Sequence, residues 1–377
     1  MVIAILGQGT IGSGVLELTR QSKDIRVKKI LEKRFQNALT TQNIADITGD
    51  PEIEAVVETM GGLHPAHEFA AQVLESGKHF VTANKLLVSA FGMDLTALAK
   101  KHGVGFLYGA ACGGGIAYLA NLKIAANVDR ITALGGILNG TTNFILDSMT
   151  RENVDYASAL QTAQNLGYAE RDPSSDVDGL DTMRKLILSS AVGFDAFLKG
   201  NDIPTFGISK VLPQDIEYAK RNGRVLRLCA VGERVNGGIC AYVEPALVSV
   251  ESPEAAILKN VNYAWYRGEA FGLMSYSGQG AGMLPTAGNV LRDLRCIQAG
   301  GRFMTNEACA PAQNLADAAK HSYYVRTAID ADFPQDWVEK RTQDGGFAYI
   351  ETVPVSVKAM HACAAENGAF IAGIQAE

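Results

Sequence analysis

The chain opens on a glycine pattern that directly follows an apolar run. Residues 2–6 are five apolar residues in succession, which is typical of a parallel strand covered on both faces. Residues 7–12 then read Gly-Gln-Gly-Thr-Ile-Gly, and residues 13–20 can be helical. In this context the glycines permit a tight turn, and the free N–H groups of the helix favour an anion such as pyrophosphate. The pattern predicts a dinucleotide-binding fold, with a plain glycine turn as the alternative.

Strands and helices alternate through the first third of the chain. Apolar runs predict strands at 27–31, 53–59 and 79–82, and the pattern over 67–76 predicts a helix. Such alternation is typical of an α/β fold with a doubly wound parallel sheet of the Rossmann type. Ligands bind beyond the carboxyl ends of these strands, so we expect Lys85 to lie near the cofactor.

The nucleotide preference depends on three charged residues at the end of the second predicted strand. Glu32 lies where an acid accepts the ribose 2′-hydroxyl of NAD. Lys33 and Arg34 follow directly, and cations suit the 2′-phosphate of NADP. A solvated charged loop is the alternative. We favour NADP over NAD, with Glu32 as the objection.

Composition excludes several other classes of protein. The 377 residues suit two or three domains, and the net charge of -6 argues against nucleic acid as a partner. No apolar run is long enough to span a membrane, and the start does not resemble a signal peptide. The six cysteines are scattered without a CxxC pair, which predicts reduced thiols in a cytoplasmic protein.

Two segments in the middle of the chain carry polar side chains. In the segment 135–146 an apolar strand ends at Asn139, and we expect a helix from near Asn143, capped by Asn139 and the two threonines between them. The capped junction can equally form the wall of a polar pocket. Further on, Asp181 and Lys185 share one face of a helix predicted to begin near Leu180. An exposed ion pair is the alternative there, worth about 0.3–0.5 kcal/mol.

These segments together resemble the homoserine dehydrogenase family. The resemblance rests on the glycine loop and on four further segments, covering about residues 1–300: ETMGGLHPAHEFAAQVLESGKHFVTANK, GGILNGTTNFIL, GYAERDPSSDVDGLDTMRKL and GQGAGMLPTAGNVLRDL. It implies reversible NAD(P)H-dependent reduction of L-aspartate 4-semialdehyde, a small-molecule substrate, to L-homoserine. This reaction serves threonine, methionine and isoleucine biosynthesis.

The resemblance also implies roles for individual residues. Lys185 is the implied proton donor or acceptor, with Lys85 and Asp181 as further catalytic residues. The acidic residues implied to bind the substrate are Glu170, Asp176 and Asp181. The residues implied to bind the cofactor are Gly7, Gly9, Thr10, Ile11, Gly12, Lys33, Arg34, Lys85, Gly167 and Gly282.

One position departs from the family pattern. Members usually carry Tyr-Glu-Ala before the central glycine run, and the glutamate and nearby carbonyls bind a monovalent cation. Here the sequence reads Tyr108-Gly109-Ala110. The carbonyls of Cys112, Gly114 and Ile116 remain as ligands, so we expect a weak cation site or none.

We expect a nucleotide domain at 1–110, completed by about 285–317 with a helix over 286–295. Residues 111–284 form the expected α+β catalytic and dimerisation domain with a mainly antiparallel sheet, including strands at 241–248 and 262–276. Residues 318–377 resemble a shortened ACT module, with a packing extension as the alternative. They include expected strands at 322–329, 347–352 and 369–375 and helices at 336–339 and 355–366. The resemblance implies a homodimer or homotetramer, with threonine as a possible effector.

Two other functions fit the same residues. One is an NAD(P)-dependent oxidoreductase acting on another small amino or hydroxy acid aldehyde. The other is a non-catalytic NAD(P)-binding regulator. The acids Glu170, Asp176 and Asp181 favour a substrate that carries an ammonium group.

Overall fold

The computed structural model describes residues 1–375, which divide into two compact units. The first unit contains Met1–Val128, Ala191–Phe197 and Gly278–Ala310. The second contains Asp129–Ser190, Leu198–Ser277 and the chain from Pro311 onward. Both units are therefore discontinuous in sequence.

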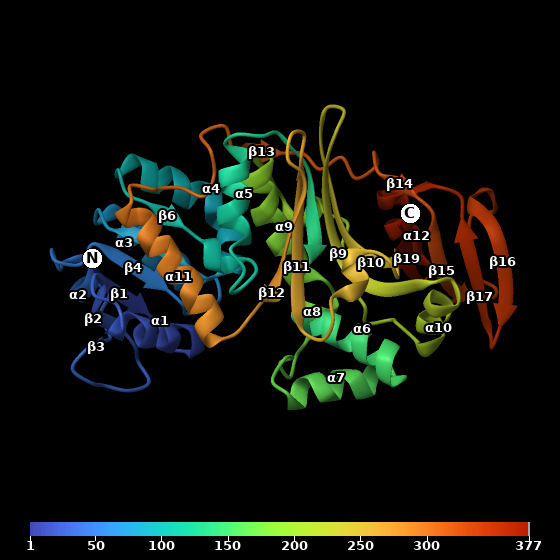
Figure 1. The fold of residues 1–377 in the computed structure, drawn as a ribbon, viewed down its shortest axis with the longest axis horizontal. Helices are drawn as coiled ribbons and strands as arrows, with labels where there is room; N and C mark the ends of the chain where they lie inside the picture. Colours follow the sequence, from blue (N-terminus) through green and yellow to red (C-terminus); the bar gives the residue numbers. More distant parts are fainter. Residues whose placement is uncertain (376–377) are drawn as a thin grey trace. The chain divides into compact units, whose positions relative to one another are not determined.

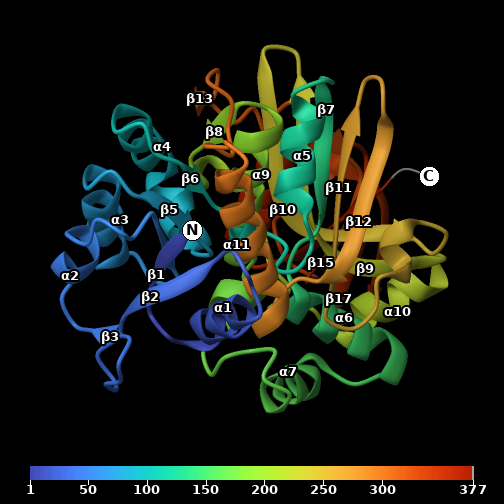
Figure 2. The same ribbon diagram turned by 60° about the vertical axis from the view of Figure 1, so that its left-hand side comes forward.

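The first unit is built on a six-stranded parallel sheet in the order β3-β2-β1-β4-β5-β6 (Figure 1). The order reverses direction between β1 and β4, so right-handed crossovers place α1 on one face and α3 on the other. Both views show α11 beside α1 (Figures 1 and 2). The expected doubly wound parallel sheet is confirmed. The elements are β1 (Val2–Leu6), α1 (Thr10–Arg20), β2 (Arg26–Leu31), β3 (Thr40–Thr41), α2 (Ala45–Thr48), β4 (Ala55–Glu58), α3 (Ala66–Glu75), β5 (His79–Thr82), α4 (Lys85–Lys101), β6 (Phe106–Leu107), the 3-10 turn η1 (Gly109–Ala111), α5 (Tyr118–Ala126) and α11 (Met283–Gln298).

The second unit is built on a nine-stranded, mainly antiparallel sheet in the order β12-β11-β7-β9-β10-β19-β15-β17-β16. Figure 2 shows β12 at its edge, paired in a long hairpin with β11. The mainly antiparallel sheet was expected and is confirmed. The strands are β7 (Ile131–Ile137), β9 (Arg224–Val235), β10 (Gly238–Ser249), β11 (Val261–Gly268), β12 (Gly272–Gln279), β15 (Tyr323–Ala328), β16 (Val338–Asp344), β17 (Phe347–Thr352) and β19 (Phe370–Ile374). The helices are α6 (Gly140–Glu152), α7 (Tyr156–Asn165), α8 (Ser174–Val177), α9 (Leu180–Gly193), α10 (Pro213–Arg221) and α12 (Val357–Glu366). Shorter elements of this unit are η2 (Gly200–Asp202), η3 (Pro253–Ala256), β14 (Lys320–His321), η4 (Gln335–Trp337) and β18 (Val355–Ser356), whereas the short strands β8 (Ala196–Leu198) and β13 (Ala310–Ala312) have residues in both units.

The structure corrects three expected elements. The single strand expected at 262–276 is the β11–β12 hairpin, because Gly268 and Gly272, the latter with φ +67°, bracket its turn. The short helix expected at 336–339 is a 3-10 turn that ends at Trp337, after which β16 begins. Helix α6 begins at Gly140 rather than near Asn143, since Asn139 itself is the N-cap.

The C-terminal residues extend the sheet of the second unit. Strand β19 pairs in parallel with β10 and antiparallel with β15. Glu244 on β10 accepts hydrogen bonds from His321 and His361, each at 2.7 Å, and from the Tyr323 hydroxyl at 3.1 Å. The last strands therefore share both a sheet and a buried polar cluster with β10.

Candidate active site

The glycine loop between β1 and α1 has the geometry of a phosphate-binding turn. Gly7 has φ +88°, and its carbonyl accepts a hydrogen bond from the Thr59 hydroxyl at 2.7 Å. A Cβ on Gly12 would lie 2.1 Å from the Gly7 carbonyl oxygen, so only glycine fits there. Gly9 is the N-cap of α1, and the first N–H groups of this helix are available to an anion.

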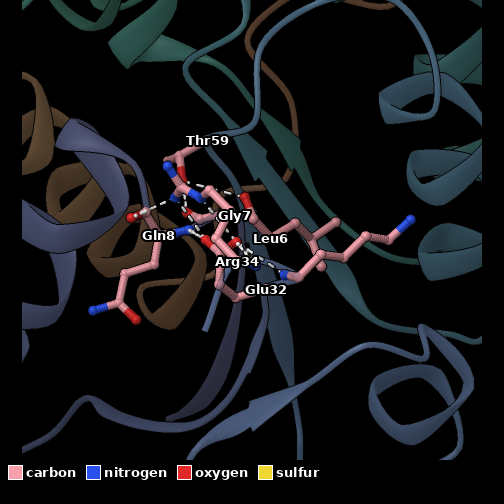
Figure 3. Close-up of polar contacts among 7 residues, drawn as sticks. Leu6, Gly7, Gln8, Glu32, Arg34 and Thr59 are labelled. Carbon is pink, nitrogen blue, oxygen red and sulfur yellow. Dashed lines mark hydrogen bonds and ion pairs between the residues drawn. The ribbon is translucent and has the colours of Figure 1, made fainter. Parts of the chain in front are cut away.

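Glu32 lies beside this loop, directly after β2, and forms an ion pair with Arg34 (Figure 3). The Nε and Nη2 atoms of Arg34 donate to the two carboxylate oxygens at 3.0 and 2.7 Å, and Nη2 also donates to the Gln8 carbonyl at 3.0 Å. The backbone N–H groups of Gln8, Lys33 and Arg34 donate to the same carboxylate at 2.9–3.0 Å. The hydrogen bond from Arg34 is the main reason why the pKa of Glu32 lies well below its usual range. Glu32 is therefore a buried anion already matched by a cation.

The Arg34 guanidinium is exposed on the side of its Nη1 nitrogen, away from Glu32. Its side chain is 64% exposed, whereas that of Glu32 is 6% exposed. Within residues 1–375 the Nη1 nitrogen makes no hydrogen bond, so two of its N–H groups can still donate. Lys33 beside it is also exposed. This end of β2 thus presents positive charge to its surroundings.

Lys85 is the first residue of α4 and is half-buried in the first unit. Asn84 caps this helix by accepting from the Leu87 N–H at 3.1 Å and donates to the Gly62 carbonyl at 2.7 Å. Glu58, at the end of β4, accepts from the Thr82 hydroxyl at 2.6 Å and from two N–H groups of the following loop. Burial raises the pKa of Glu58. This network fixes the turn that carries Lys85.

In the second unit, Lys185 and Asp181 form a buried ion pair on α9. The Lys185 ammonium lies 2.7 Å from Asp181 Oδ2 and donates to the Leu138 carbonyl as well. The two side chains are only 8% and 5% exposed. The expected i, i+4 pair is therefore buried, and the alternative of an exposed ion pair does not describe it.

Asn139 joins this pair to a second acid, Asp176. Its side-chain nitrogen donates to Asp176 Oδ1 at 2.7 Å and to Asp181 Oδ2 at 2.9 Å. Its side-chain oxygen accepts from the Thr142 N–H at 2.8 Å, which caps α6. One residue thus caps a helix and holds two carboxylates together, and the use of this junction as the wall of a polar pocket stays a prediction. We call Asn139, Asp176, Asp181 and Lys185 the acid–lysine cluster.

The other predicted site residues lie as follows. Glu170 is exposed, and within the described residues its carboxylate makes no hydrogen bond to the acid–lysine cluster. Gly167 is exposed with φ +75° in the loop after α7. Gly282 has φ +120° and is the N-cap of α11 in the first unit. Lys85 and the glycine loop belong to the first unit, whereas Lys185 belongs to the second.

Two of the three carbonyls expected as cation ligands, those of Gly114 and Ile116, accept hydrogen bonds from a side chain that the sequence analysis did not single out. The Nδ2 nitrogen of Asn289 on α11 donates to the carbonyls of Gly114 and Ile116, at 2.9 Å in the latter case. Four positions further along the helix, Asp293 Oδ2 accepts from the Gly109 N–H at 2.7 Å. Burial raises the pKa of Asp293 to about 7. We call residues 112–116 the carbonyl loop.

Three residues with structural roles at these sites were missed, namely Glu58, Asn289 and Asp293. Glu58 could have been noticed as an acid at the end of a predicted parallel strand, where ligands gather. Asn289 and Asp293 carry no such signal, because their partners lie more than 170 residues away.

No three His, Cys, Asp or Glu side chains in residues 1–375 are arranged to hold a metal ion. None of the helices in that range is long and apolar enough to cross a bilayer.

Sequence comparisons identify related proteins for both units. A family model described as homoserine dehydrogenase matches residues 118–294. A second, described as the NAD binding domain of homoserine dehydrogenase, matches residues 7–109. A homoserine dehydrogenase of Bacillus subtilis is 36% identical over 313 residues, which are 78% of this chain and 72% of that protein. One of Synechocystis is 37% identical over 346 residues, or 86% and 79%.

Structural comparison gives the same family. A crystal structure of a homoserine dehydrogenase from Thiobacillus denitrificans has a TM-score of 0.90 at 30% identity, covering 100% of this chain and 98% of that one. A homoserine dehydrogenase from S. aureus has a TM-score of 0.78 at 27% identity, with 100% and 99% covered. The similarity therefore extends to the C-terminal residues that follow the matched family models.

Proposed function

We propose a catalytic role for Lys185 in this chain, which belongs to the homoserine dehydrogenase family. In this role Lys185 transfers the proton in the reaction. The chain is an oxidoreductase that interconverts L-aspartate 4-semialdehyde and L-homoserine. The observation that supports the role of Lys185 is its buried ammonium, held 2.7 Å from Asp181 within the acid–lysine cluster. This observation also favours a catalytic protein over a regulator that merely retains the fold.

The proposed chemistry follows from what the aldehyde needs. A bound nicotinamide cofactor supplies hydride to the aldehyde carbon, and negative charge then develops on the oxygen. The Lys185 ammonium stabilises that charge and donates a proton to the oxygen. In the reverse direction neutral Lys185 accepts the proton of the alcohol. Asp181 orients the amine, and Asn139 orients Asp181.

The acids around the lysine are proposed to bind the amino-acid end of the substrate. Asp176 and Asp181 present carboxylates on one side of Asn139, where a substrate ammonium would find opposite charge. Glu170 is exposed on the loop before α8, so its carboxylate is free to turn toward a ligand. In this proposal Asp181 serves both the substrate and the catalytic lysine.

The first unit fits a nicotinamide dinucleotide, and we propose that it prefers NADP. The cradle is formed by Gly7, Gly9, Thr10, Ile11 and Gly12, where a side chain at Gly12 would collide with the loop. Arg34 neutralises Glu32 and keeps two N–H groups free for a 2′-phosphate. Glu32 would favour NAD if its carboxylate were free to accept the ribose 2′-hydroxyl. Because Arg34 already donates to both carboxylate oxygens, this objection to NADP is weakened. Lys85 at the start of α4 and Gly282 at the start of α11 complete the proposed nucleotide contacts.

The role of Lys185 is tested by Lys185→Ala in the full chain. We expect turnover to fall by at least about a thousandfold, as expected when a proton-transfer group is removed. NADPH binding, followed by nucleotide fluorescence, should remain within a few-fold because the glycine loop lies in the other unit. Lys199→Ala removes the same charge from an exposed position of the same region and should behave as the parent protein. Activity of Lys185→Ala near that of the parent would refute the role.

Assembly, effector and location remain predictions. We propose a homodimer or homotetramer formed along β12, an edge strand on which Leu273 and Met274 are 46% and 41% exposed.

For the C-terminal residues we favour a packing role over a separate ACT-like module, because their strands continue the sheet of β10. Threonine as an effector is tested by calorimetry and by assays with and without threonine. A cytoplasmic location is proposed from the biosynthetic activity and from six cysteines that form no disulfide in residues 1–375.

A further inference from the structure

The carbonyl loop turns tightly against helix α11. Gly113 and Gly114 both have positive φ, at +82° and +52°, and the Gly115 N–H donates to the Gln279 carbonyl at 3.0 Å. The turn aims the carbonyl oxygens of Gly114 and Ile116 at one side chain, that of Asn289. Asn289 is 3% exposed, so this contact is shielded from water. Two buried acceptors thus converge on a single donor group.

The surrounding residues do not fit a monovalent cation. Carbonyl and carboxylate oxygens are the ligands that hard cations prefer, and a carboxylate supplies the balancing charge. At position 109 this chain has no side chain, and the Asn289 amide directs its two hydrogens at the carbonyls a cation would need. A cation placed among these atoms would meet the positive end of the amide dipole.

Arg292 determines which way the Asn289 amide faces. Its Nη1 nitrogen donates to Asn289 Oδ1. If the amide were reversed, its NH2 group would face the guanidinium, and its oxygen would face two carbonyl oxygens. Both contacts would then be repulsive. The charge on Arg292 also polarises the amide, which strengthens its donation to the carbonyl loop.

We propose that the side-chain amide of Asn289, held and polarised by Arg292, takes the place of a monovalent cation in this chain. It donates to the Gly114 and Ile116 carbonyls that a cation would need, so that the loop is ordered without Na⁺ or K⁺. The positive charge is supplied by Arg292 at the surface of the unit rather than by a buried ion. The inference concerns the order of the loop and stands whether or not Lys185 moves the proton.

The missing glutamate is explained by the same helix. Gly109 donates its N–H to Asp293, and a Cβ on residue 109 would lie 2.7 Å from Asp293 Oδ1. Asp293 is 3% exposed and cannot move away without losing this hydrogen bond. Helix α11 therefore supplies an acceptor to the N–H of Gly109, which precedes the carbonyl loop, and a donor to the carbonyls of that loop.

The test compares thermal unfolding of the full chain in NaCl, KCl and choline chloride. All samples have the same total salt of about 0.2 M, so that long-range electrostatics are equally screened. We expect the midpoint of the parent protein to be the same in the three salts. Asn289→Asp replaces the amide hydrogens by a carboxylate oxygen. Its midpoint should fall in choline by at least about 3 °C, because buried carbonyls lose their donor, and NaCl or KCl should restore part of the loss.

A matched pair of arginine variants isolates the polarising charge. Arg292 and Arg295 are both exposed on α11, but only Arg292 contacts Asn289, whereas Arg295 pairs with Asp24. Arg292→Ala should lower the midpoint more than Arg295→Ala in choline chloride. This pair remains informative if Asn289→Asp does not fold.

Three results would overturn the proposal. The first is a saturable rise in the midpoint of the parent protein with Na⁺ or K⁺ that choline does not reproduce. The second is an Asn289→Asp variant as stable as the parent protein in choline chloride. The third is an equal effect of Arg292→Ala and Arg295→Ala.

Discussion

The contact between Glu32 and Arg34 predicts how one substitution changes the choice of nucleotide. Arg34→Ala removes the guanidinium and leaves the Glu32 carboxylate with its three backbone N–H donors. A ribose 2′-hydroxyl can then donate to the freed side of this carboxylate, which favours NAD. A 2′-phosphate loses its cation and meets an unscreened anion. The substitution should therefore reverse the preference from NADP to NAD.

The magnitude follows from the hydrogen bonds concerned. Charge-assisted hydrogen bonds between an arginine and a phosphate contribute about 1.5–3 kcal/mol. The restored hydrogen bond to the 2′-hydroxyl adds about 0.5–1 kcal/mol in favour of NAD. The ratio of kcat/KM for NADP to that for NAD should thus fall by about 2–4 kcal/mol, or roughly 30- to 700-fold. Removing the guanidinium also leaves Glu32, whose side chain is 6% exposed, as a buried carboxylate without its cation, so the free energy of unfolding should fall by about 1–3 kcal/mol.

The assay follows nicotinamide absorbance during homoserine oxidation with each nucleotide in turn. Arg26→Ala is a suitable control, because Arg26 is an equally exposed arginine, paired with Glu52 at the opposite end of β2. It should leave the nucleotide ratio unchanged. If Arg34→Ala also left the ratio within about threefold of that of the parent protein, Arg34 would not determine the preference for NADP.

Two further predictions concern the second unit. Burial raises the pKa of Glu244, but hydrogen bonds from His321 and His361 more than offset this and hold it at about 2, below the ordinary value of 4.5. A depressed carboxyl pKa stabilises the fold above about pH 4.5, and this contribution of about 3 kcal/mol is lost as the pH falls toward 2. Urea denaturation should show this loss in the parent protein, and Glu244→Gln should be less stable at neutral pH with a flatter profile over that range. Leu273→Arg on edge strand β12 should lower the molar mass measured by light scattering, and an unchanged mass would place the interface elsewhere.

The sequence predicted the elements whose signal is local. Strand β1, the glycine loop and the first turn of α9 at Leu180 lie where they were expected, because each depends on a few adjacent residues. The Asp181–Lys185 pair could be read from helical spacing alone. Its burial could not, because that depends on Asn139 and Leu138, more than 40 residues earlier.

Elements with a weak local signal were missed. Strand β16 reads Val-Glu-Lys-Arg-Thr-Gln-Asp and has no buried face, because it is the last strand of its sheet. Among the strands of residues 1–375 it pairs with β17 alone. The hydrogen bonds of Asn289 were equally beyond reach, since an asparagine inside a helix carries no sign of distant carbonyls. In both cases the structure depends on pairing between segments that sequence periodicity does not describe.

The ion pairs formed by Glu32 in the first unit and by Asp181 in the second have different desolvation costs. Arg34 is exposed, so Glu32 is neutralised with little desolvation of the guanidinium. Lys185 and Asp181 are both withdrawn from water, and for such a pair the desolvation penalty can exceed the attraction between the charges. Two apolar side chains of similar volume would fill the same space on α9 without that penalty. Stability therefore gives no reason for this chain to hold a buried lysine beside Asp181 and the Leu138 carbonyl, whereas the proton transfer proposed for Lys185 does.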